Sequence, residues 1–169
     1  MTKADFDEFV RQQQPMHPEV APVDWSAQRD EWLGYLDALY EKLEGFLGKY
    51  ISSGQIQRHY QEIELNEEDI GAYKATKMIL RIGRQTVTFL PIGTIMVGSK
   101  GRVDVRGPSG DGALILVDKK SIGIRSLFFG QPPVAPEWEW KIFPRPPETK
   151  FTPLNSDNFH EMIMEIAHG

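Results

Sequence analysis

The stretch from Gly71 to Lys120 constrains the fold most strongly, because it alternates β-rich segments with glycine-containing turns. Residues 73–82 and 85–97 are rich in β-branched and aromatic side chains, and only Gly83-Arg84 separates them. A glycine at the first position of a two-residue loop accepts the positive φ of a type II′ turn, whose twist suits paired strands. The sequence therefore predicts a β-hairpin here, with a bulge or an edge position at Pro91, which lacks a backbone N–H.

Two further glycine-rich turns, at residues 98–101 and 107–112, mark off two more strands. In residues 102–106 the valines alternate with charged residues, which indicates a strand with one buried face. Residues 113–117 are apolar throughout, as is typical of a central strand covered on both faces. The stretch is therefore expected to form a four-stranded antiparallel meander.

Helical patterns lie on both sides of this meander. Residues 27–52, with Ser26 as the expected N-cap and Gly54 after the end, repeat apolar side chains at intervals of three and four. This stripe comprises Trp32, Leu36, Leu39, Tyr40, Leu43, Phe46, Leu47 and Tyr50. A shorter helix with the same periodicity follows an expected cap at Asn155 or Ser156. Because both stripes must be covered, we expect the two helices to pack on the apolar face of the sheet.

Three other segments extend the sheet or lead into it. Residues 55–63, 122–129 and 137–143 have strand patterns of varying regularity. Together the elements predict an α+β fold, in which an antiparallel β-meander of five to six strands packs against a long N-terminal helix and a short C-terminal helix. We expect residues 1–24 to form a short helix and a proline-rich linker, and residues 25–169 to form a single α+β domain.

The chain of 169 residues contains no cysteine, which excludes disulfides and thiolate metal sites. The first thirty residues contain no apolar run of the signal-peptide type. No segment approaches the roughly 20 apolar residues that are needed to span a bilayer. These features predict a cytoplasmic protein that does not enter a membrane.

Charge is unevenly distributed along the chain, whose formal net charge is -5. Residues 71–130 carry ten Lys/Arg and three Asp/Glu, whereas the other residues carry nine and twenty-one. Either the acidic surroundings neutralise a basic sheet within one fold, or a basic sheet face binds an acidic partner. An acidic chain is poorly suited to phosphate binding, so nucleic acid is the less favoured partner.

The basic-face hypothesis depends on four arginines that are expected on the outward side of the meander. They are Arg81, Arg84, Arg102 and Arg106. A guanidinium group can bind a carboxylate with two parallel hydrogen bonds. The expected partner is therefore an acidic protein surface, either on another copy of the chain or on a different subunit.

An acidic cluster precedes the meander and offers oxygen ligands. Five carboxylates fall within eight residues, namely Glu62, Glu64, Glu67, Glu68 and Asp69. The cluster lacks the regular ligand spacing and the glycine of an EF-hand loop, so we expect a solvated acidic turn and no metal site. Alternatively, the cluster pairs with a basic sheet face in this chain or in another. No cofactor is predicted from the sequence.

One constellation suggests catalysis. An aspartate on one strand and a Glu-x-Lys on a paired strand hold Mg²⁺ in many nucleases, and Asp104, Glu139 and Lys141 match this pattern. Glu-x-Lys also arises by chance on amphipathic strands, and no companion carboxylate is evident. The serine and histidine residues have no nucleophile-elbow or triad context. The leading hypothesis is therefore a non-enzymatic protein-interaction module, with a Mg²⁺-dependent nuclease as the alternative.

Three short motifs carry a resemblance to other proteins. At residues 91–94, 101–104 and 138–141, followed by the short C-terminal helix, the chain resembles a group of small uncharacterised bacterial proteins. The resemblance covers residues 27–169. It implies a bacterial accessory protein and brings no activity, cofactor or site residue.

Overall fold

The computed structural model describes residues 3–13, 23–94, 99–119 and 137–168. Four helices occur in this part of the chain, and they are α1 (Lys3–Gln13), α2 (Trp25–Phe46), α3 (Gly48–Ser52) and α5 (Ser156–Ala167). Seven strands lie between α3 and α5. They are β1 (Ile56–Glu67), β2 (Gly71–Ile82), β3 (Gln85–Gly93), β4 (Ser99–Gly107), β5 (Gly110–Asp118), β6 (Trp138–Ile142) and β7 (Thr152–Pro153).

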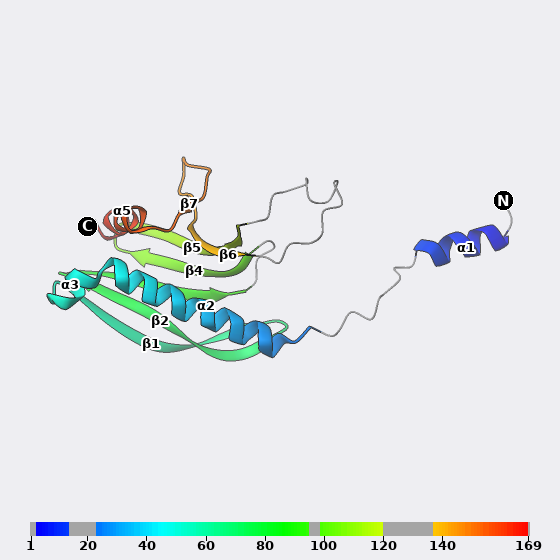
Figure 1. Cartoon of the computed structure of the whole chain (residues 1–169), viewed down its shortest axis with the longest axis horizontal. Coiled ribbons are helices and arrows are strands. Elements are labelled where there is room, and N and C mark those ends of the chain that lie inside the picture. Colours follow the sequence, from blue (N-terminus) through cyan, green and yellow to red (C-terminus); the bar gives the residue numbers. More distant parts are fainter. Residues whose placement is uncertain (1–2, 14–22, 95–98, 120–136, 169) are drawn as a thin grey trace.

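The seven strands form one sheet in which each strand pairs with the next in the sequence and every pair is antiparallel (Figure 1). The α+β class and the antiparallel meander are therefore confirmed. The strand count exceeds the predicted five to six, partly because β7 adds a strand of only two residues within a proline-rich segment. The strand predicted at residues 122–129 lies outside the described residues.

Two local predictions about the meander are confirmed. Gly83 has a φ of +61°, and no described non-glycine residue has a positive φ, so the φ of Arg84 is negative. This combination is that of a type II′ turn, because a type I′ turn needs a positive φ at both central residues. The β3–β4 register shifts between Pro91 and Gly93, so the strand bulges next to the proline.

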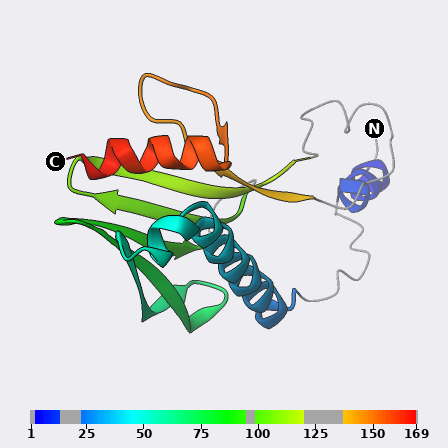
Figure 2. The ribbon, with the colours of Figure 1, turned by 60° about the vertical axis from the view of Figure 1, so that its left-hand side comes forward.

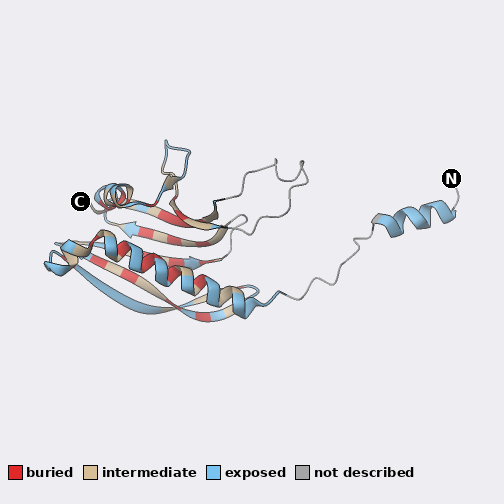
Figure 3. Cartoon of the chain, viewed as in Figure 1, coloured by how far each residue is buried: buried red, intermediate tan, exposed pale blue. Residues whose placement is uncertain are grey.

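Helices α2 and α5 cover the same face of the sheet, which we call the inner face (Figures 2 and 3). The predicted stripe packs against this face, where Phe46 and Tyr50 are partly buried and the other six residues are buried, namely Trp32, Leu36, Leu39, Tyr40, Leu43 and Leu47. Phe159 of α5 lies against both Phe46 of α2 and Phe89 of β3. Glycines allow close approach, because a Cβ at Gly101 would overlap the Trp32 ring.

The start and end of the long helix differ from the prediction. The N-cap is Asp24 and not Ser26, because the Asp24 carboxylate accepts the backbone N–H of Ala27 at 3.0 Å. The helix is interrupted at Leu47, so that α2 and α3 are separate. Glycines at 45 and 48 flank the interruption, and glycine weakens a helix interior.

The β1–β2 hairpin twists strongly along its length. Tyr73 and Ala75 are buried near one end of β2, whereas Met78 and Leu80 are buried near the other, so the buried side changes within the strand. The β1–β2 register has no shift across these residues, which means that twist and not a bulge causes the change. The two ribbons cross in Figure 1.

Candidate protein-interaction surface

The face of the sheet opposite α2 and α5, the outer face, carries most of the arginines that the sequence singled out. Arg81 of β2 pairs with Thr86 of β3, and Thr88 pairs with Arg106 of β4. Because directly paired residues share a face and side chains alternate along a strand, Arg81 and Arg106 project from the same side. Arg84 lies in the adjoining β2–β3 turn. We call Arg81, Arg84 and Arg106 the basic end of the outer face.

Arg102 differs from the other three arginines because it is held within the chain. Its Nε lies 2.7 Å from Asp104 Oδ1, and its guanidinium lies over the Phe143 ring at 5.7 Å from the centroid. Arg106 is 4.0 Å from the other oxygen of Asp104 and keeps a side-chain exposure of 58%. Arg81 and Arg84 are exposed and make no ion pair with the described residues. Arg102 is therefore the least available of the four for a partner.

The acidic surroundings neutralise part of the basic segment. Lys74 pairs with Glu62 at 3.1 Å, and Lys100 pairs with Glu31 of α2 at 2.8 Å. These contacts neutralise Lys74 of the β1–β2 hairpin and Lys100 near the start of β4. They leave the basic end with two unpaired arginines among the described residues.

A shallow hollow opens beside Arg81. It has a volume of about 370 Å³ and is lined by Gly54, Gln55, Gln57, Arg81 and Gly83. Arg81 is the only charged residue in this lining, so the hollow favours an anionic or neutral polar group next to the arginine.

The nuclease constellation is not assembled in the way that the hypothesis requires. Strand β5 lies between β4 and β6, so Asp104 and Glu139 are not on paired strands. Asp104 is opposite Ala113 and Glu139 is opposite Val117, which separates them by two strand spacings across, about 10 Å, and by about 13 Å along the strands. Lys141 is likewise on β6. The described residues contain no group of three or more carboxylates and histidines that could hold a metal ion.

The acidic cluster departs from the predicted solvated turn, because Glu62, Glu64 and Glu67 lie in β1 and only Glu68 and Asp69 lie in the turn that follows. Glu67 is only 3% exposed, although Glu62, Glu64, Glu68 and Asp69 are exposed. Its Oε1 accepts hydrogen bonds from the backbone N–H and the hydroxyl of Thr94, at 2.8 and 2.6 Å, and its Oε2 accepts the Tyr73 hydroxyl.

The burial of Glu67 could have been read from the sequence. Ile63, Leu65 and Glu67 are alternate residues of one strand, so they share a face that is partly apolar. Burial raises the pKa of the Tyr73 phenol, and the Glu67 carboxylate beside it raises this pKa further. Gly93 is needed for the contact, because a Cβ there would lie 2.7 Å from the Glu67 carboxyl carbon. The group is a buried structural link and not an open site.

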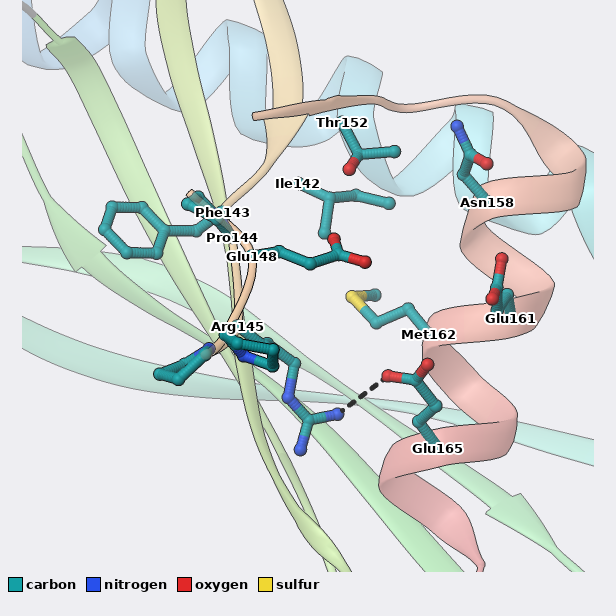
Figure 4. A pocket seen from close by; sticks show the side chains of 12 residues that line it. Ile142, Phe143, Pro144, Arg145, Glu148, Thr152, Asn158, Glu161, Met162 and Glu165 are labelled. Atoms are coloured by element: carbon teal, nitrogen blue, oxygen red, sulfur yellow. Dashed lines mark hydrogen bonds and ion pairs between the residues drawn. The ribbon is translucent and has the colours of Figure 1, made fainter. Parts of the chain in front are cut away.

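A second surface lies between α5 and the loop that follows β6 (Figure 4). This groove has a volume of about 560 Å³ and a partly apolar wall that includes Ile142 and Met162. Glu148, Glu161 and Glu165 also line it, and Arg145 Nη1 pairs with Glu165 at 3.2 Å. The groove is therefore acidic, opposite in sign to the basic end. The sequence did not reveal it because the groove depends on the packing of α5 beside a proline-rich loop, which no local pattern specifies.

None of the helices in the described part of the chain combines the length and the apolar character that crossing a membrane requires. Comparisons with protein-family models, with curated proteins and with solved structures give no significant match.

Proposed function

We propose that the chain is a non-enzymatic protein-interaction module, an accessory subunit of a bacterial intracellular complex, that binds an acidic protein surface through the basic end of its outer face. The observation that carries the proposal is that Arg81 and Arg84 are exposed and without ion pairs among the described residues. An unpaired surface arginine gains most from a carboxylate supplied by a partner, because the guanidinium fork can form two charge-assisted hydrogen bonds.

The spacing of the arginines favours a compact acidic patch over a nucleic-acid backbone. Arg81 and Arg106 are two strands apart and about 12 Å from each other by sheet geometry. Carboxylates interrupt the outer face beyond them, since Asp111 lies opposite Arg106 and Asp104 lies two residues before it. A phosphate backbone would need a longer continuous basic path.

A capture experiment with matched charge variants tests the proposal. The full chain is immobilised as wild type, as Arg81→Glu plus Arg106→Glu, and as Lys42→Glu plus Lys150→Glu. Each is exposed to lysate of the native host, once without and once with nuclease treatment. Both double variants change the net charge equally, and Lys42 and Lys150 are exposed residues away from the basic end. Mass spectrometry identifies what is retained.

We expect wild type and the lysine variant to retain the same acidic protein, and the arginine variant to lose it. Because the contact is electrostatic, retention should also fall as the salt concentration rises. Equal retention by both double variants, or retention that nuclease abolishes, would contradict the proposal.

A further inference from the structure

Helix α1 presents an apolar stripe that no other described residue of the chain covers. Phe6, Phe9 and Val10 are 59%, 54% and 41% exposed, and residues 3–12 of α1 are all exposed. The Phe6 and Phe9 rings stack on each other with centroids 6.4 Å apart. A helix of 11 residues is marginal in water without tertiary packing, so this stripe requires a surface to dock on.

The charge of α1 indicates which surface it fits. The helix carries three carboxylates, Asp5, Asp7 and Glu8, and two basic residues, of which Arg11 pairs with Glu8. At 100° per residue, Asp5 and Asp7 fall on opposite borders of the phenylalanine stripe. This pattern complements the basic end of the outer face. It is repelled by the acidic groove at α5.

The outer face also offers apolar contacts for the stripe. Ile79 of β2 and Leu90 of β3 project from it and are half-buried, and Ile79 pairs with Thr88. These residues lie between Arg81 and the Arg102–Asp104 pair. A helix that lays its phenylalanines on this strip can place Asp7 near the basic end.

The length of the connecting segment favours a second copy of the chain. Residues 14–24, which join α1 to α2, number eleven and include three prolines, and eleven fully extended residues span at most about 40 Å. If α1 docked on its own chain, the connecting segment would have to run the length of β4. Glu31 of α2 pairs with Lys100 at one end of β4, and Arg106 lies about 20 Å further along that strand. The two turns of α2 before Glu31 add about 10 Å. Little length then remains for passing around the sheet edge.

We propose that α1 of one copy docks on the outer face of a second copy, beside Arg81 and Arg106, so that two copies exchange their N-terminal helices. The inference rests on the proposed function and names the acidic occupant of the basic end. A reciprocal exchange uses the same patch on both subunits and closes as a two-fold dimer.

The absence of cysteine from the chain allows a direct test by disulfide trapping. A full-length Val10→Cys chain, enlarged by a mass tag, is mixed with a full-length Thr88→Cys chain and oxidised. Only docking between copies produces the mixed disulfide, which the tag distinguishes on a non-reducing gel. The control partner is Thr149→Cys, an exposed position beside the acidic groove. We expect the mixed disulfide with Thr88→Cys to exceed that with Thr149→Cys at least tenfold.

Added changes identify the forces that hold the arm. Two double substitutions should each reduce the mixed disulfide to the control level. One is Phe6→Ser plus Phe9→Ser on the tagged chain, and the other is Arg81→Glu plus Arg106→Glu on its partner. Sedimentation equilibrium of the wild-type chain should give a dimer, and the phenylalanine variant a monomer. A signal unchanged by the arginine substitutions would overturn the inference.

Failure of this inference can be distinguished from failure of the proposed function. In one outcome the wild-type chain is a monomer, the mixed disulfide does not form, and a chain carrying both Val10→Cys and Thr88→Cys forms a disulfide within itself. This outcome shows that α1 docks on its own chain, and it overturns exchange between copies. A monomer with neither disulfide, which still captures an acidic protein through Arg81 and Arg106, overturns the inference and leaves the proposed function in place.

Discussion

Oε1 of Glu67 accepts hydrogen bonds from both the backbone N–H and the hydroxyl of Thr94, at 2.8 and 2.6 Å, and so ties the end of β1 to the end of β3. These strands are not neighbours, because β2 lies between them. The link holds the twisted β1–β2 hairpin against the bulge that follows Pro91. The link lets Tyr73 pack into the core from one side of β2, whereas near the other end of β2 the opposite side, with Met78 and Leu80, faces the core.

Removal of this carboxylate should destabilise the fold. Glu67→Ala leaves the Tyr73 hydroxyl and the Thr94 N–H buried without an acceptor, and an unsatisfied buried polar group costs about 1–3 kcal/mol. Urea unfolding measures the change. Glu68→Ala, in the same acidic cluster but exposed, should stay within about 0.5 kcal/mol of wild type. Equal stability of the two variants would show that the Glu67 contacts do not contribute.

Gly93→Ala should also destabilise the chain, for a different reason. Gly93 has a φ of +127°, and an added Cβ would lie 2.7 Å from the Glu67 carboxyl carbon. The matched control is Gly34→Ala, in the exposed interior of α2 with no atom within 4 Å of the new Cβ, which should stabilise by about 0.5–1 kcal/mol. Combining Gly93→Ala with Glu67→Ala should cost less than the sum of the two changes, because the second removes the clashing group. Additive effects would contradict the close approach.

Much of the fold could be predicted because it depends on local patterns. The Gly83 turn, the bulge at Pro91 and the doubly buried strand β5 each follow from the sequence around them. The C-terminal helix was predicted with its cap, since Asn155 Oδ1 accepts the backbone N–H of Asn158 at 2.8 Å.

Side-chain orientation and long-range packing decided what could not be predicted. That Arg102 is held by Asp104 follows from two side chains on one strand turning toward each other instead of outward. Asp104 and Glu139 are far apart because β5 lies between their strands, and no local sequence pattern specifies this strand order. The acidic groove needs α5 to pack beside a loop that has almost no regular structure of its own.

The α2 stripe provides a test of the inner face. Leu43 is fully buried, and Leu43→Ala should lower the free energy of unfolding by about 2–5 kcal/mol because it leaves a cavity between helix and sheet. Glu41→Ala, two residues earlier on the exposed side of the same helix, should change it by less than about 0.5 kcal/mol. Thermal or urea unfolding of both variants measures the difference. A Leu43→Ala curve that overlays wild type would place the stripe outside the core.

Stability should fall in alkaline solution because of the buried tyrosines. Burial, and then the neighbouring Glu67 carboxylate, raise the pKa of Tyr73 in the folded chain above the value of about 10 that holds in the unfolded chain. The stabilisation from this group is therefore complete below about pH 10 and is lost as the pH rises above it, because the unfolded phenol releases its proton first. Urea unfolding of wild type and Tyr73→Phe between about pH 8 and 11 should give a steeper decline for wild type. Some decline should remain in the variant, since burial raises the pKa of Tyr40, and partial burial together with the Glu44 carboxylate raises the pKa of the more exposed Tyr60. Parallel declines in the two proteins would show that Tyr73 ionises equally easily in the folded and unfolded chain.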